Sequence, residues 1–142
     1  MEGIILNRVI FRFERELSSR LYGFLANRGM HHCLVELYSY TRITPISVVA
    51  FIDLKRAFDV TNRDIIFDQL VDFGVMGNLL GWVREYLLNR TFRVLCKGAS
   101  SAVAEFGLGT PQGGVLSPFL FNVLMHRMLS LLPDVPGITI TC

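Results

Sequence analysis

The sequence predicts an α+β domain, because helical segments and short strand-like segments both occur without strict β-α alternation. Three observations support this. Apolar side chains recur along residues 3–17 with the period of a helix, residues 46–53 form a short apolar run, and residues 91–106 hold two extended segments around a glycine. The 142 residues suffice for one small domain with its own core, but not for two.

The N-terminal part contains two expected helices and one expected strand. Apolar side chains recur at every fourth position from Ile5 to Leu17, which predicts an amphipathic helix over residues 3–17. A second helix is expected over residues 30–40. The run 46–53 is almost wholly apolar and rich in β-branched side chains, as is typical of a strand covered on both faces.

Two further helices are predicted over residues 63–73 and 78–89. The first has clear boundaries, since Asn62 is a good N-cap and Gly74 is a residue type that ends helices.

A hairpin, a loop and a last helix follow. Residues 91–97 and 102–106 are expected to pair as a β-hairpin through the linker between them. Residues 107–114 read as a glycine-rich loop, and Pro118 or its neighbour Ser117 opens a helix, since proline is favoured in a first turn. Residues 138–142 resemble the start of another strand.

The amino-acid composition limits the classes of protein to which this chain can belong. Half of the residues (51%) are hydrophobic, which is high for a domain that stands alone, so we expect the chain to be a piece of a larger protein. The net charge of +2 permits nucleic-acid binding without arguing for it. No apolar run reaches the roughly 20 residues of a transmembrane helix, and no secretory pattern begins the chain. The three cysteines are widely spaced, which argues against zinc and for a reduced, intracellular setting in nucleus or cytoplasm.

Asp53 is the first candidate functional residue. It ends an apolar run, where a buried layer meets a cleft, and a carboxylate there can bind Mg²⁺. The alternative is that Asp53 only caps the following turn. Phe58 could wall a nucleotide pocket or belong to the core, and Asp59 is expected to be a structural hydrogen-bond acceptor.

Gln112 is the second candidate. It lies between Pro111 and the pair Gly113-Gly114, where a backbone without side chains can approach a ligand closely. A glutamine side chain both donates and accepts hydrogen bonds. No Lys-Ser/Thr follows the glycines, so this is not a Walker A loop, and an ordinary turn is the alternative.

Two segments carry a family resemblance. Residues 51–59 (FIDLKRAFD) and 109–125 (GTPQGGVLSPFLFNVLM) resemble two signature segments of the reverse transcriptase domain of non-LTR (LINE-type) retrotransposons. Group II intron maturases share related segments. Residues 22–29 resemble the family's fingers segment more weakly, and the likeness extends over about residues 6–142.

The resemblance implies a role for each matching position. Asp53 matches the first metal-binding aspartate of a two-metal, magnesium-dependent polymerase, and Phe58 matches the steric gate against a ribose 2′-hydroxyl. Gln112 and Gly113 match the loop that touches the incoming nucleotide and the template base. Arg28 matches an arginine that can reach the triphosphate.

The resemblance also implies a fold. The whole chain (1–142) would be a single incomplete reverse transcriptase domain, a partial right-hand polymerase with fingers and an incomplete palm. Residues 1–45 and about 61–116 would be fingers-like, and residues 46–60 and 117–142 palm-like. The Asn122 side chain would support the loop from beneath.

The implied function is RNA-directed DNA polymerisation: magnesium-dependent nucleotidyl transfer from a deoxynucleoside triphosphate to a DNA primer 3′-hydroxyl on an RNA template. The family's aromatic-x-Asp-Asp segment is not in the sequence. We therefore expect this chain alone to be inactive, not to hold magnesium by itself, and to need the missing palm and thumb segments as partners. The alternative is a non-catalytic RNA-binding remnant or a maturase-like fragment, in which Arg28, Lys55 and Arg56 hold an RNA backbone.

Overall fold

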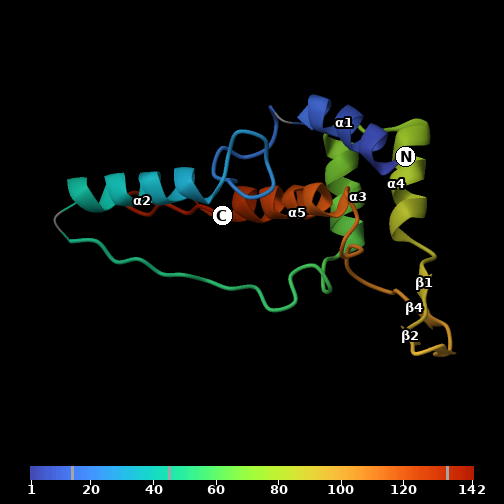
Figure 1. The fold of residues 1–142 in the computed structure, drawn as a ribbon. Helices are drawn as coiled ribbons and strands as arrows, with labels where there is room; N and C mark the ends of the chain where they lie inside the picture. The colour runs from blue at the N-terminus through green and yellow to red at the C-terminus, as the bar shows by residue number, and fades with distance from the viewer. Residues whose placement is uncertain (14, 45, 134) are drawn as a thin grey trace.

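The computed structural model describes residues 1–13, 15–44, 46–133 and 135–142. Within them, helices and short strands alternate irregularly, which confirms the α+β prediction (Figure 1). The helices are α1 (Glu2–Phe13), α2 (Met30–Ile43), α3 (Arg63–Asp72), α4 (Gly77–Leu87) and α5 (Ser117–Leu131). The strands are β1 (Thr91–Phe92), β2 (Leu95–Cys96), β3 (Ala99–Ser100) and β4 (Ala104–Glu105). No helix in these ranges is long and apolar enough to span a membrane.

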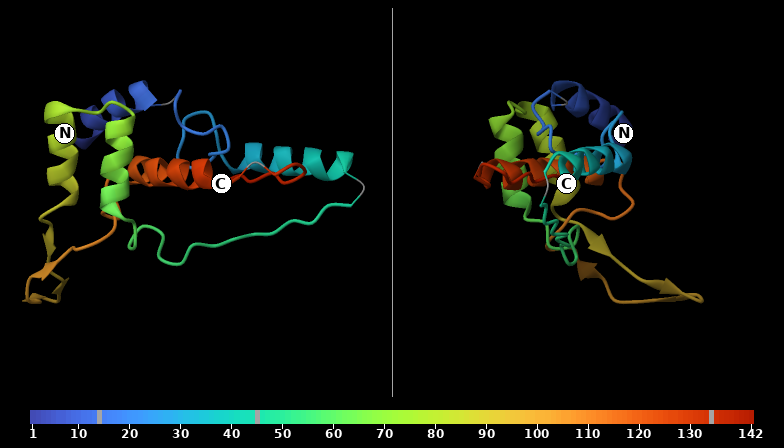
Figure 2. Two further views of the ribbon diagram at one scale, coloured as in Figure 1. Left: turned by 180° about the vertical axis from the view of Figure 1, so that it is seen from behind. Right: turned by 90° about the vertical axis from the view of Figure 1, so that its left-hand side faces the viewer.

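The helices form a packed body with two projections (Figures 1 and 2). Helix α3 packs against both α4 and α5, and α1 crosses the end of the α3–α4 pair. Helix α2 and the chain after it extend away on one side, and the β-hairpin projects on another. The loop of residues 107–116 runs from this hairpin back to the start of α5.

The hydrophobic core lies between α1, α3, α4 and α5. Phe13 stands near its centre, with ring centroids 5.0 Å from Phe73 and 5.9 Å from Phe119. Each fully buried large apolar side chain contributes about 1.5–3 kcal/mol to folding. The fully buried members include Val9, Phe13, Leu21, Ile66, Leu70, Val75, Val83, Leu87, Leu116, Leu120 and Val123.

Helix α3 confirms the boundaries expected from its end residues. The Asn62 side chain accepts hydrogen bonds from the backbone N–H groups of Asp64 (2.9 Å) and Ile65 (3.5 Å). Gly74 follows the helix with φ of +77° and donates its N–H to Val71 O at 2.7 Å, while Val75 N–H reaches Leu70 O at 2.8 Å. These two bonds form a Schellman motif.

The other helices are confirmed with shifted ends. The first was expected over residues 3–17, but α1 ends at Phe13, and Leu17 is buried beyond it. Helix α2 runs to Ile43, past the expected end at Tyr40.

The hairpin is confirmed, with a different turn. Strand β1 pairs antiparallel with β4, and β2 with β3. The linker was expected at residues 98–101, but β3 already begins at Ala99, and the turn consists of Lys97 and Gly98. Both have positive φ, +47° and +83°, which is the signature of the type I′ turn that suits the twist of a hairpin.

The strand predicted over residues 46–53 is wrong. Residues 47–54 have no regular secondary structure, and no neighbouring strand pairs with them in the described chain. Val48, Phe51 and Ile52 are 94%, 86% and 87% exposed. A strand needs a hydrogen-bonded neighbour as well as apolar side chains, and the described sheets lie only in the hairpin.

The strand predicted over residues 138–142 is also wrong. Its last residue is instead tied to the loop before α2: Cys142 N–H donates to Arg20 O at 2.9 Å, and Tyr22 N–H donates to Cys142 O at 2.6 Å.

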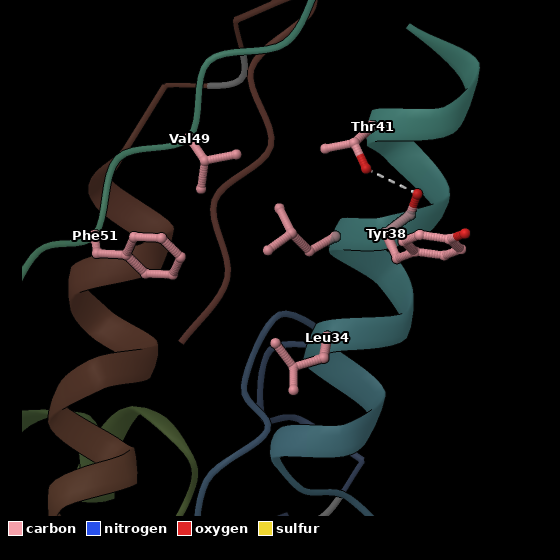
Figure 3. Close-up of a pocket in the computed structure, with 6 residues that line it drawn as sticks. Leu34, Tyr38, Thr41, Val49 and Phe51 are labelled. Carbon is pink, nitrogen blue, oxygen red and sulfur yellow. Dashed lines mark hydrogen bonds between the residues drawn. The ribbon is translucent and has the colours of Figure 1, made fainter.

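An apolar pocket of about 440 Å³ lies between α2 and the extended segment after it (Figure 3). Val49 and Phe51 line one side, and α2 lines the other with Leu34, Leu37, Tyr38 and Thr41. The Thr41 hydroxyl donates to Tyr38 O at 3.0 Å. None of these side chains is an acid, a base or a thiol that could take part in phosphoryl transfer, so the pocket is not the candidate catalytic site.

Candidate nucleotide site

The glycine-rich loop is fixed against the segment that carries Phe58 and Asp59. Gly109 N–H donates to Thr61 O at 3.0 Å, and Thr110 N–H donates to Phe58 O at 2.9 Å. Gly109 has φ of +80°, and a Cβ there would lie 2.4 Å from Phe58 O and 2.6 Å from Asp59 O. Only glycine satisfies both the backbone conformation and this approach.

Arg63 holds the same loop from α3. It is only 6% exposed, and its guanidinium donates to Gly109 O (2.8 Å), Phe106 O (2.8 Å) and Leu108 O (3.1 Å). Burial, and secondly the charge of Arg90, lower the pKa of Arg63 from its ordinary value. Sequence reasoning missed Arg63, because an arginine in the first turn of a helix has no local signal that distinguishes it from a solvated side chain.

Gln112 is oriented by Asp59. The side-chain Nε2 of Gln112 donates to Asp59 Oδ1 at 2.8 Å, which confirms Asp59 as a structural hydrogen-bond acceptor. The two residues share a groove of about 290 Å³ at the base of the hairpin. The groove presents positive, negative, amide and aromatic groups together. Its lining residues are Asp59, Arg90, Thr91, Phe92, Phe106, Pro111 and Gln112.

Phe58, next to Asp59, is half-buried in a group of aromatic rings. Its ring centroid lies 4.7 Å from that of Phe121 on α5 and 6.1 Å from that of Phe24, which it meets edge to face. Aromatic pairs of this kind are favourable by about 0.5–1.5 kcal/mol each, which stabilises this orientation of the ring.

Asp53 is exposed in the extended segment. In the part of the chain that the structure describes, no hydrogen bond joins it to Asp59 or Gln112. No group of three or more His, Cys, Asp or Glu in these ranges could hold a metal ion. Mg²⁺ needs several oxygen ligands, so Asp53 offers one of them, and the described residues do not fit a complete magnesium site.

Arg28 and Asn122 both stabilise the loop before α2. Arg28 Nη1 donates to the carbonyls of Ser18 (3.2 Å), Leu21 (3.2 Å) and Ser19 (3.4 Å). Asn122, 3% exposed, donates from Nδ2 to Gly23 O at 2.8 Å. Asn122 is therefore structural as expected, but it supports the loop before α2 rather than the glutamine loop.

Gly113 leaves the loop backbone open at the site. It has φ of +84°, and a Cβ built there would meet no atom within 4 Å. The structure thus gathers Phe58, Asp59, Gln112 and Gly113 in one region, while Arg28 is engaged with a different loop.

The sequence matches the model of a protein family and is similar to several retrotransposon proteins. The family described as "Reverse transcriptase (RNA-dependent DNA polymerase)" matches residues 2–142. The chain is 28% identical over 135 residues to "RNA-directed DNA polymerase from mobile element jockey" of Drosophila melanogaster, covering 90% of this chain and 14% of that protein. It is 32% identical over 89 residues to "Retrovirus-related Pol polyprotein from type-2 retrotransposable element R2DM" of the same species, covering 63% and 8%. A related R2 polyprotein of Nasonia vitripennis is 35% identical over 92 residues, covering 63% and 9%.

Proposed function

Since this chain belongs to the reverse transcriptase (RNA-dependent DNA polymerase) family, we propose that it forms the nucleotide-holding part of a retrotransposon RNA-directed DNA polymerase. The observation that carries the proposal is the hydrogen bond between Gln112 and Asp59, which line one groove, with Phe58 directly before Asp59 in the chain. An RNA template and a DNA primer would be the nucleic-acid partners. The chain spans 14% of the length of the jockey polymerase, so other segments would complete the enzyme.

Each site residue has a proposed task. The Gln112 side chain and the open backbone at Gly113 would contact the incoming deoxynucleoside triphosphate and the template base opposite it. The packed ring of Phe58 would exclude a ribose 2′-hydroxyl, because a ring held by Phe24 and Phe121 cannot move aside freely. Arg28 would reach the triphosphate only by leaving its carbonyl partners.

Asp53 would contribute one carboxylate to magnesium. Magnesium held there would supply charge stabilisation for phosphoryl transfer, and carboxylates from other parts of the enzyme would complete its ligand set. In the proposed division, residues 46–60 and 117–142 belong to the palm, and residues 1–45 and about 61–116 to the fingers.

Binding measurements on the chain test the proposal. We would titrate a deoxynucleoside triphosphate into the chain with an RNA–DNA primer–template, comparing the wild type, Gln112→Ala and the control Asn78→Ala, which removes an exposed amide on α4. Gln112→Ala should weaken nucleotide binding about tenfold, as expected for one lost hydrogen bond of about 1.4 kcal/mol. Asn78→Ala should leave it unchanged.

Two results would contradict the proposal. Equal nucleotide affinity in Gln112→Ala and wild type would remove Gln112 from the site. Salt-sensitive RNA binding with no nucleotide dependence would favour the alternative, a chain that binds the RNA backbone without chemistry.

A further inference from the structure

The carboxylate of Glu2 lies at the start of α5, although the two are distant in sequence. Glu2 Oε2 accepts hydrogen bonds from the N–H groups of Val115 (2.8 Å) and Leu116 (3.4 Å). At a helix N-terminus such N–H groups lack intrahelical partners, and the helix dipole favours negative charge there. Leu116, in the N-cap position of α5, has no side chain that could accept these bonds. Glu2 therefore caps α5 from another helix.

Tyr86 connects this cap to the glutamine loop. Its hydroxyl lies 3.3 Å from Glu2 Oε2 and 3.2 Å from Ser117 Oγ, and the Ser117 hydroxyl donates to Pro111 O at 2.6 Å. Tyr86 and Ser117 are only 9% and 2% exposed. Burial raises the pKa of Tyr86, so its hydroxyl stays protonated. The contacts thus run from Glu2 to the carbonyl of the residue before Gln112.

Gly114 makes this arrangement possible. A Cβ at Gly114 would lie 2.1 Å from the Tyr86 hydroxyl oxygen and 2.9 Å from Ser117 Oγ. The second glycine of the Gly113-Gly114 pair therefore serves the contacts with Tyr86 and Ser117, whereas Gly113 faces open space.

We infer that Glu2 is a positioning residue for Gln112. The loop has two anchors: Gly109 and Thr110 tie its beginning to residues 58–61, and the Glu2–Tyr86–Ser117 contacts tie its end. Loss of the second anchor frees the backbone on one side of Gln112 and lowers nucleotide affinity without removing any group that touches the nucleotide. This inference rests on the proposed role of Gln112 in nucleotide binding.

The test compares Glu2→Ala, Glu2→Gln and Glu85→Ala in the chain. Glu85 is an exposed carboxylate on α4 next to Tyr86, so Glu85→Ala is a matched control for charge. Hydrogen exchange of the Val115 and Leu116 amides and the NMR resonances of the Gln112 side-chain amide are measured first. Glu2→Ala should speed exchange of the Val115 amide roughly tenfold and shift the Gln112 resonances, because a charge-assisted bond is lost. Glu2→Gln keeps an acceptor oxygen and should restore most of the protection.

Nucleotide titration then separates this inference from the proposed function. Glu2→Ala should weaken deoxynucleoside triphosphate binding several-fold, Glu2→Gln less, and Glu85→Ala not at all. Tyr86→Phe should reduce nucleotide affinity less in the Glu2→Ala background than in the wild-type background, because both changes break the same contacts. If Glu2→Ala leaves exchange and the Gln112 resonances unchanged, the positioning role is wrong. If those signals respond but no variant, wild type included, binds nucleotide, the proposed function fails and the positioning role stands.

Discussion

The side chains of Gln112 and Asp59 are joined by a hydrogen bond of 2.8 Å, which couples the glycine-rich loop to the segment that carries Phe58. Both residues are exposed, so this bond contributes only about 0.5–1.5 kcal/mol to folding. The hydrogen bond matters mainly because it orients the side-chain amide of Gln112 toward the groove at the base of the hairpin. The buried contacts around it, at Gly109 and Arg63, carry the stability.

Replacing Gly109 by alanine should destabilise the chain more than the same change at Gly98. Both glycines have φ near +80°, so both substitutions cost about 1–2 kcal/mol in backbone strain. At Gly109 the new Cβ would also lie 2.4 Å from Phe58 O, which adds about 1–3 kcal/mol, whereas nothing lies within 4 Å at Gly98. Urea denaturation measures both free energies of unfolding. Equal losses in the two variants would mean that the close approach is not present.

Arg63→Met should lower the free energy of unfolding by about 2–4 kcal/mol, because it leaves the carbonyls of Gly109, Phe106 and Leu108 without their donor. Methionine keeps much of the apolar stem, so the change reports mainly on the guanidinium. Arg93→Met, at an exposed position on the hairpin, is the control and should change stability by less than about 0.5 kcal/mol. A loss below 1 kcal/mol for Arg63→Met would show that water replaces these hydrogen bonds at little cost.

Acid should destabilise the chain through His126. Its Nδ1 accepts the N–H of Ser18 at 3.0 Å, an arrangement that requires a neutral ring. Burial lowers the pKa of His126 below its usual 6.5, with the nearby Glu16 opposing the shift. The unfolded chain then binds the proton at higher pH than the folded chain. Stability should be complete above about pH 6.5 and fall as the pH drops from there through the lowered pKa.

Denaturation between pH 7.5 and 5 measures this effect. In His126→Gln the part of the pH dependence below pH 6.5 should be smaller, while His31→Gln, at an exposed position on α2, should keep the wild-type profile. Identical slopes in wild type and His126→Gln would assign the acid sensitivity to other groups.

The elements that the sequence predicted correctly are those with local causes. Asn62 and Gly74 set the ends of α3 through hydrogen bonds to residues at most five positions away. The hairpin likewise depends on one turn, although this turn consists of Lys97 and Gly98, both with positive φ, whereas the expected linker was residues 98–101. Asp59, which was expected to accept a structural hydrogen bond, accepts one from Gln112, while the nucleotide-binding role of Gln112 stays a prediction.

The features that were missed depend on long-range partners. The apolar run 46–53 has the composition of a buried strand, but pairing requires a neighbouring strand that composition does not supply. Glu2 looks like an ordinary charge in the first turn of a helix, and its partners Val115 and Leu116 lie more than 100 residues away. Arg63 likewise gains its role only when the loop after the hairpin returns to α3.

Asn122→Ala should loosen the loop before α2 and leave the glutamine loop in place. Asn122 donates to Gly23 O, and its removal should cost about 1–2 kcal/mol, because a buried side-chain hydrogen bond is lost. Hydrogen exchange resolves where this cost appears. Amides of residues 21–28 should exchange faster, while that of Thr110, which is bonded to Phe58 O, should stay protected. Asn78→Ala, at an exposed position, should change neither region. Faster exchange at Thr110 with no change near Gly23 would mean that Asn122 supports the glutamine loop after all.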